Sequence, residues 1–275
     1  MLSTIIKEKI IQNTFIRAIS IATLNFIFYS KTIKSWFEKH IFNPYEIDGN
    51  ESADYALMQL RCITKHLDVS GKTILEIGPG GSYYLACLLL QEGAKKVFVI
   101  DNENHNFFSK KEIIIYRNLF SESIQNEKIN QEKIEVLHYE KNGQIPLPPE
   151  TCDIIYSNAV FEHVNKPQKL LLECERLLKK DGQMMHQIDF RDHIFDQKFL
   201  FFLKVPAILF DTLYKNTGMW VNRLRYSEWI DIFSSLKKMK ISISQKQYGI
   251  LLPTKQTSED HKITSALFIL KKHVS

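Results

Sequence analysis

The sequence is poor in cysteine and contains no closely spaced cysteine pair. It has four cysteines in 275 residues, none in a C-x-x-C arrangement, and three of them lie in apolar patterns typical of strands or helices. We therefore expect buried free thiols in a reducing compartment, which favours a cytoplasmic location, and we expect no metal site.

The chain also lacks arginine-rich runs and long apolar runs. Its net charge of +5 is spread over well-mixed acids and bases, so we expect no nucleic-acid partner, while an anionic substrate or membrane surface stays open. Only 13 residues separate Arg17 from Lys31, whereas a membrane span needs about 20. With 44% hydrophobic residues, the chain has enough apolar side chains for a sizeable core.

Residues 1–50 predict an N-terminal amphipathic helical extension, because isoleucine, leucine and phenylalanine recur among lysines and an arginine. Two interpretations stay open. The extension could cap the main domain, or it could lie on the inner face of the membrane as an interfacial helix.

Residues 72–101 organise the rest of the chain. A buried strand is expected at 73–77, a glycine turn after it, a helix at 82–92 and a second strand at 97–100 that ends at Asp101. This order predicts a nucleotide-binding half of a doubly wound α/β fold.

The residues of the turn narrow the choice of ligand. Gly78 and Gly80 fit a dinucleotide fingerprint, but bulky Tyr83 stands where its third glycine would be. Glu76 just before the turn suits a cationic ligand better than a diphosphate, and Asp101 is placed to accept from ribose hydroxyls. S-adenosylmethionine has cationic groups, a ribose and no phosphate. This stretch resembles the class I S-adenosylmethionine-dependent methyltransferases.

A second motif strengthens the resemblance. The sequence Ser-Asn-Ala-Val-Phe-Glu-His-Val at 157–164 directly follows an expected strand at 154–157, and it resembles the corresponding signature of small-molecule methyltransferases of this class. Further strands are expected at 134–138, 183–188, 240–248 and 264–270, with helices at 52–67 and 102–126. The resemblance covers residues 70–190 and extends to bacterial members of saccharide and secondary-metabolite pathways.

The resemblance implies a Rossmann-like, mostly parallel seven-stranded sheet with an antiparallel last strand. It also implies S-adenosylmethionine as cofactor, held by residues at the carboxyl ends of the strands: Glu76, Gly78, Pro79, Gly80, Asp101, Glu140 and Asn158. The methyltransferase domain would span residues 51–275, with a core at 70–190 and a helical cap insertion at 191–226.

The segment Asp189–His193 and the cap should select the acceptor. We expect Asp189, Arg191 and Arg223 to bind substrate, although Arg191 could instead pair with Asp189 or Asp192. His193 or His163 could act as general base, since imidazole titrates in the useful range; either could equally be a structural or hydrogen-bonding histidine. The apolar insertion is interpreted as a lid, a lipid-facing surface or half of a homodimer interface.

The sequence therefore predicts methyl transfer from S-adenosylmethionine to a small molecule, at an oxygen atom. Two alternatives stay open: a lipid or lipid-linked saccharide acceptor at the membrane surface, and a non-catalytic protein that binds S-adenosylmethionine. Tyr83 disfavours a nicotinamide oxidoreductase.

Overall fold

The computed structural model describes the central sheet and the helices around it. The described residues are 19, 22–23, 49–80, 82–101, 124–125, 128–129, 132–194, 200–215, 219–249 and 259–273. The predicted N-terminal extension lies almost wholly outside them, although Ile19, Ala22 and Thr23 are helical. Among the described residues, no helix combines the length and the apolar character needed to cross a membrane.

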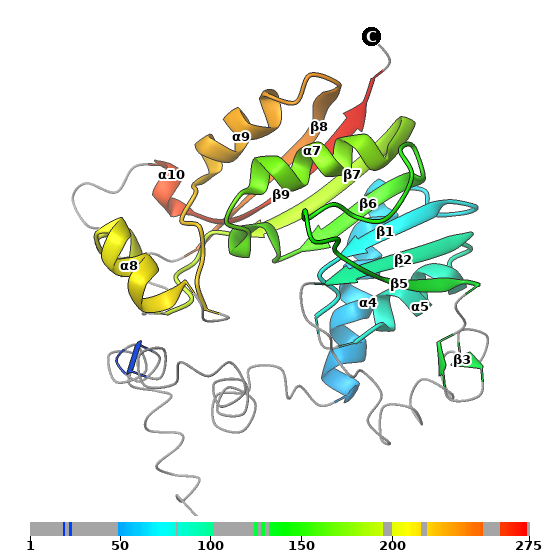
Figure 1. The fold of residues 1–275 in the computed structure, drawn as a ribbon, viewed down its shortest axis with the longest axis horizontal. Helices are drawn as coiled ribbons and strands as arrows, with labels where there is room; N and C mark the ends of the chain where they lie inside the picture. The colour runs from blue at the N-terminus through cyan, green and yellow to red at the C-terminus, as the bar shows by residue number, and fades with distance from the viewer. Residues whose placement is uncertain are drawn as a thin grey trace, which may run out of the picture.

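Seven strands form the central sheet. They are β1 (Thr73–Ile77), β2 (Lys96–Asp101), β5 (Ile134–His138), β6 (Cys152–Asn158), β7 (Leu178–Asp189), β8 (Met239–Tyr248) and β9 (Ile263–Lys272). Their order in the sheet is β5-β2-β1-β6-β7-β9-β8 (Figure 1). The first five pair in parallel, and β9 runs antiparallel to both β7 and β8. The predicted Rossmann-like sheet with an antiparallel last strand is confirmed.

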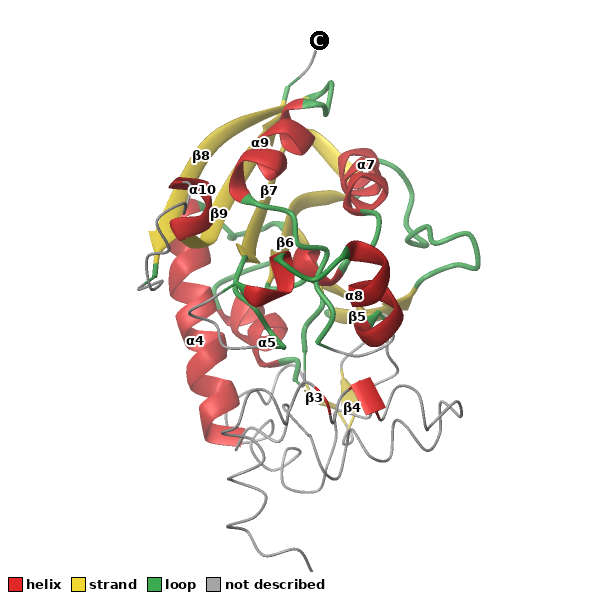
Figure 2. Ribbon diagram, turned by 90° about the vertical axis from the view of Figure 1, so that its left-hand side faces the viewer, coloured by secondary structure: helices red, strands yellow, loops and turns green. Residues whose placement is uncertain are grey.

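Helices cover both faces of this sheet. On one face lie α4 (Gly49–His66) and α5 (Tyr84–Gln91); on the other lie α7 (Pro167–Leu177) and α9 (Tyr226–Ser234) (Figures 1 and 2). Strand β1 shows why the central strands are continuous apolar runs in the sequence: both of its faces are buried. Ile74 packs into the core under α4 and α5, whereas Leu75 and Ile77 pack into the opposite core.

The chain after β7 builds a small core of its own. It contains the 3₁₀ turn η3 (Phe201–Leu203) and α8 (Ala207–Tyr214), which lies apart from both helical layers (Figure 1). A cluster of buried side chains holds this segment together: Ile194, Leu200, Phe202, Phe210, Tyr214, Trp220 and Val221. The buried carboxylate of Asp192 anchors its start by accepting from the backbone N–H groups of Ile194 and Phe202, at 3.0 and 2.9 Å.

Three local expectations need correction. The helix expected at 52–67 begins earlier, at Gly49 of α4, since small and polar residues are tolerated at a helix start. Most of the helix expected at 102–126 lies outside the described residues, and near its predicted end β3 (Ile124–Gln125) pairs with β4 (Lys128–Ile129) instead. Strand β7 begins at Leu178 rather than at 183, because Leu178 pairs with Cys152 of β6 before the register shifts.

Candidate active site

The glycine turn after β1 is shaped by a contact with the chain after β6. Gly78 has φ +69°, and a Cβ added there would lie only 2.5 Å from Cγ2 of Val160. The Gly78 N–H donates to the carbonyl of Ile100 at 2.8 Å, which fixes the turn against the end of β2. Gly80 has the same φ but open space around it. Only glycine therefore fits at 78 without strain, whereas the backbone at 80 is left open to a ligand.

Glu76 is a buried carboxyl group beside this turn. It is 3% exposed, and its Oε2 has no hydrogen-bond partner among the described residues. Burial raises the pKa of Glu76 to about 8, and the negative charge of Asp101 adds to the shift. A cationic group bound here would offset both effects.

Tyr83 fills the position at which a dinucleotide fingerprint has its third glycine. Its side chain is buried with α5 in the core on that face of the sheet. Burial first, and then the charges of Asp101 and Glu76, raise the pKa of its phenol well above the usual range. The phenol therefore stays neutral beside the two acids, and a bulky ring takes the space of the missing glycine.

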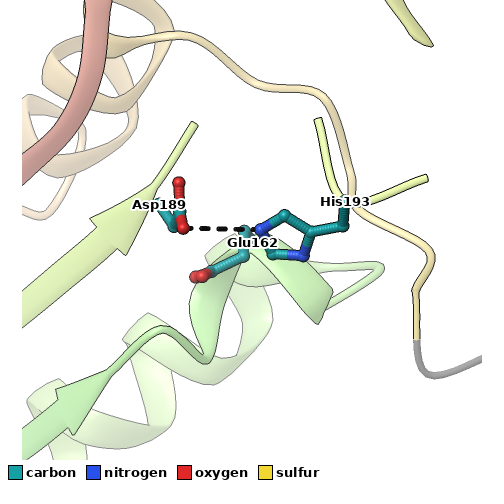
Figure 3. Close-up of side chains that lie close together, drawn as sticks. All are labelled: Glu162, Asp189 and His193. Atoms are coloured by element: carbon teal, nitrogen blue, oxygen red, sulfur yellow. Dashed lines mark ion pairs between the residues drawn. The ribbon is translucent and has the colours of Figure 1, made fainter. Parts of the chain in front are cut away.

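A second polar group lies where β6 and β7 end. Glu162 and His163 are in the 3₁₀ turn η2 (Phe161–His163) directly after β6, Asp189 is the last residue of β7, and His193 follows four residues later. Figure 3 shows Glu162, Asp189 and His193 close together, with Asp189 and His193 joined as an ion pair at 3.5 Å. Two segments separated in sequence thus meet at one edge of the sheet.

Asp189 is held in its ionised form. Burial would raise the pKa of Asp189, but the nearby imidazole of His193 and the hydrogen bonds from Arg191 outweigh the effect of burial and keep that pKa well below its usual range. Arg191 donates from Nε to both carboxylate oxygens, at 2.9 Å each. Of the two roles considered for Arg191, the structure therefore displays the pairing with Asp189.

Glu162 is more deeply buried than any of its charged neighbours. It is 2% exposed, and neither carboxylate oxygen has a hydrogen-bond partner of normal geometry among the described residues. The backbone N–H groups of Glu162 and Asp189 lie near enough to favour its charge, but burial dominates and raises its pKa well above the usual value. Sequence analysis did not select Glu162, although it belongs to the quoted motif.

His163 has a defined tautomer. Its Nδ1–H donates to the carbonyl of Trp220 at 2.7 Å, so Nε2 carries the lone pair. Burial, and then the neighbouring His193, lower the pKa of His163 to about 4. The two imidazole rings lie 5.1 Å apart between their centroids. The two predicted catalytic histidines are thus brought together.

Tyr55 is another residue that sequence analysis missed. It comes from α4, far from the motifs, and its phenol oxygen accepts a short hydrogen bond from the side-chain amide of Asn158. Burial, with smaller effects of the charges of Glu162 and Asp189, raises the pKa of Tyr55. Helix α4 thereby contacts the end of β6, and no sequence pattern in residues 52–67 predicts this contact.

Two predicted site residues are engaged elsewhere. Glu140 lies in an exposed turn after β5, where its carboxylate accepts from the side chain of Asn142. Arg223 donates from Nη1 to the carbonyls of Phe202 and Val205, at 2.9 and 2.7 Å, so it braces the segment around η3. Binding of adenine by Glu140 and of substrate by Arg223 stay predictions.

Comparisons with known proteins agree with this geometry. Residues 75–186 match the family model described as a methyltransferase domain. A crystal structure of an S-adenosylmethionine-dependent methyltransferase from Mesorhizobium loti is 13% identical, with a TM-score of 0.51, and the match covers 82% of this chain and all of that one (100%). The cyclase SpnF is 11% identical, with a TM-score of 0.51 over 84% of this chain and 86% of its own. These two likenesses show the fold alone. No curated protein matches the chain significantly.

The fold and the matched family model define the class of this protein. Residues 75–186 form a class I S-adenosylmethionine-dependent methyltransferase domain, and S-adenosylmethionine is its methyl donor. The residues at the end of β1 fit that donor: Glu76 offers a buried carboxylate oxygen without a hydrogen-bond partner among the described residues, and Gly78 and Gly80 place no side chain at two positions of the turn.

Replacing Gly78 by alanine should destabilise the protein more than replacing Gly80. Both positions have φ +69°, so each Ala variant takes on left-handed strain of about 1–2 kcal/mol. Only at 78 does the new Cβ also meet Val160. Urea denaturation should show a larger loss for Gly78→Ala, and a second substitution, Val160→Ala, should recover part of the difference. Equal losses at the two glycines would contradict the packing argument.

The buried Glu76 should make the ligand-free protein lose stability as pH rises. Because the folded pKa is raised to about 8, its stabilising contribution is complete below the unfolded pKa of about 4.5 and is lost as pH rises through about 8. Relative to wild type, Glu76→Gln should gain stability over that window, by up to about 1.4 kcal/mol per pH unit. Urea denaturation at roughly pH 5 and pH 8, which lie inside this window, measures the difference between the variant and wild type.

The same variant should bind S-adenosylmethionine about 10- to 100-fold more weakly, because a charge-assisted hydrogen bond contributes about 1.5–3 kcal/mol. Calorimetry tests this, and unchanged affinity would exclude Glu76 from the donor site.

Proposed function

We propose that this methyltransferase acts on a hydroxyl oxygen of a small-molecule acceptor. The observation that supports this proposal most directly is the pair of imidazoles, His163 and His193, at the carboxyl ends of β6 and β7. A hydroxyl group must lose its proton as it becomes an ether, so an O-methyltransferase benefits from a positioned base.

The donor supplies a sulfonium methyl group, whose bond to sulfur breaks as the acceptor oxygen attacks the carbon and loses its proton. The protein's part is to place that oxygen and receive the proton. Positioning accounts for much of the rate in such a transfer, because the donor is already reactive.

Several contacts keep the imidazoles in place. Trp220 fixes the tautomer of His163, and Asp189 holds His193. The side-chain amide of Asn222 donates to the carbonyls of Phe161 and Val164, at 2.8 and 3.1 Å, which ties η2 to the segment after the cap. The acceptor side is therefore braced from both ends of the cap insertion.

The contact between Gly78 and Val160 supports a short distance between the proposed donor site after β1 and the proposed acceptor site near η2. Val160 lies two residues before Glu162, and its side chain packs against the turn predicted to hold the donor. An acceptor near η2 would therefore lie close to a donor bound at the ends of β1 and β2.

Removing the imidazoles should lower turnover without removing the donor. In His163→Ala and His193→Ala, kcat should fall, by about 10²- to 10⁴-fold in whichever variant has lost the base, while calorimetry finds unchanged affinity for S-adenosylmethionine. Methyl-labelled donor and a panel of hydroxyl, amine and carbon acceptors would identify the product. Labelling of amines or carbon acceptors alone would overturn the proposal, as would two variants that both turn over a hydroxyl acceptor normally.

A second candidate is a lipid or lipid-linked acceptor at a membrane surface. It is favoured by α8, where Ile208 is 83% exposed and Leu209 is also exposed, with Lys204 and Lys215 flanking the helix. Apolar side chains beside lysines suit an anionic interface.

On this second hypothesis, full-length protein should sediment with vesicles that contain anionic lipid, and the double variant Ile208→Ser, Leu209→Ser should sediment several-fold less. Vesicles of neutral lipid serve as the control for charge. Failure of the wild-type protein to sediment with either vesicle would exclude this candidate and leave a small-molecule acceptor.

A further inference from the structure

The group formed by Glu162, Asp189 and His193 has the dimensions of a metal-binding site. One oxygen of each carboxylate and one ring nitrogen of the histidine all lie within 4.8 Å of one another. Figure 3 shows the three side chains converging from η2, from the end of β7 and from the loop after it. The group therefore draws on two segments of the backbone, η2 and the stretch from the end of β7 into the loop that follows it.

One spacing within the group suits two ligands of one ion better than a direct hydrogen bond. His193 Nε2 and Asp189 Oδ2 are 3.5 Å apart, which is long for a charge-assisted hydrogen bond. Two donors each about 2.1 Å from a tetrahedral ion would lie about 3.4 Å apart. The observed separation needs almost no adjustment to accept an ion between these atoms.

Glu162 supplies an independent reason to expect a ligand. Only 2% of its surface is exposed, yet both of its carboxylate oxygens lack a hydrogen-bond partner of normal geometry among the described residues. A buried polar group without a partner is costly, and a second carboxylate, Asp189, lies beside it. A bound cation would satisfy both carboxylates at once.

We propose that Glu162, Asp189 and His193 bind a divalent cation. Two carboxylates and one imidazole form a mixed donor set that suits Mn²⁺ or Zn²⁺, and Mg²⁺ less well. Three protein ligands leave at least one coordination position open, as in catalytic rather than structural metal sites. This proposal departs from the expectation, drawn from the sequence, that the protein has no metal site.

The surroundings of the three ligands support this assignment. Arg191 donates to both oxygens of Asp189, from its backbone N–H and from its guanidinium, and orients that carboxylate, so a bound ion would share Asp189 with this guanidinium. The backbone N–H of Asn222 donates to the carbonyl of Glu162 at 2.7 Å and fixes η2. His163 is left outside the ligand set and hydrogen-bonds to Trp220.

The cation would give the site a role in selecting the acceptor, and this role rests on the proposed O-methylation. In the open position the ion would coordinate the acceptor hydroxyl and ease its deprotonation. The oxygen then forms its bond to the methyl carbon, the electron pair of the broken carbon–sulfur bond stays on sulfur, and the proton passes to His163. His193 would accordingly be a ligand.

Metal binding can be tested without any acceptor. Full-length protein stripped with a chelator and dialysed is titrated with Mn²⁺, and the loss of the free-ion signal in electron paramagnetic resonance counts the bound ions. We expect one site per chain, weakened at least tenfold in Glu162→Gln and in His193→Ala. Asp231→Asn, an exposed acid on α9, is the matched control and should bind as wild type does.

Folding of the variants is checked by thermal unfolding. Glu162→Gln is isosteric and removes a buried carboxyl group, so its metal-free midpoint should equal or exceed that of wild type, and Mn²⁺ should raise the midpoint of wild type only. Equal binding of Mn²⁺ by wild type and both ligand variants would overturn the proposal. Absence of stoichiometric binding of Mn²⁺, Zn²⁺ and Mg²⁺ by wild type would do the same.

The same samples separate this inference from the proposed function. S-adenosylmethionine is titrated into them by calorimetry, and hydroxyl acceptors are assayed with labelled donor. Turnover of a hydroxyl acceptor by protein that binds no metal would defeat the cation site alone. Metal binding by protein that methylates only amines would keep the site but remove its role on a hydroxyl.

Discussion

The close packing of Gly78 against Val160 is the contact on which the active site depends. It joins the turn after β1, where residues predicted to bind the donor lie, to the chain after β6, which leads into Glu162 and His163. A side chain at 78 would force the Val160 side chain or one of these two segments to shift, and methyl transfer is sensitive to such shifts because reacting atoms must approach to about 3–3.5 Å. The absence of one Cβ thus determines how close the donor and acceptor residues can lie.

The segment after β7 stabilises η2, on the proposed acceptor side of the site, although the segment packs around a core of its own. Its small core is separate from the two cores of the sheet, yet the Trp220 carbonyl and the Asn222 side chain return from it to hold η2. A change in this segment can therefore reposition η2 while the sheet stays the same, in keeping with function residing in sites carried by a common fold.

Much of the fold was predictable from the sequence because both faces of the sheet are covered. Strands at 73–77 and 134–138 were predicted with their observed bounds, since apolar runs between turn residues leave few alternatives. The site was predicted only in part. Asp189 and His193 stand out as polar residues after a strand, but Tyr55 reaches the site by tertiary packing of α4. Glu162 gains its importance from burial, which no local pattern encodes. Arg223 was predicted to bind substrate, yet its guanidinium donates to two backbone carbonyls.

The position of β9 makes the order of assembly of the sheet differ from the order of the sequence. Strand β8 pairs only with β9, and β9 fills the place between β8 and β7. During synthesis β8 emerges first but has no neighbour to join, so the β7 edge stays open until Ile263–Lys272 has left the ribosome. The half of the sheet that follows β7 therefore closes in a single late step. Such long-range pairing slows folding and leaves an unpaired, aggregation-prone edge in the nascent chain.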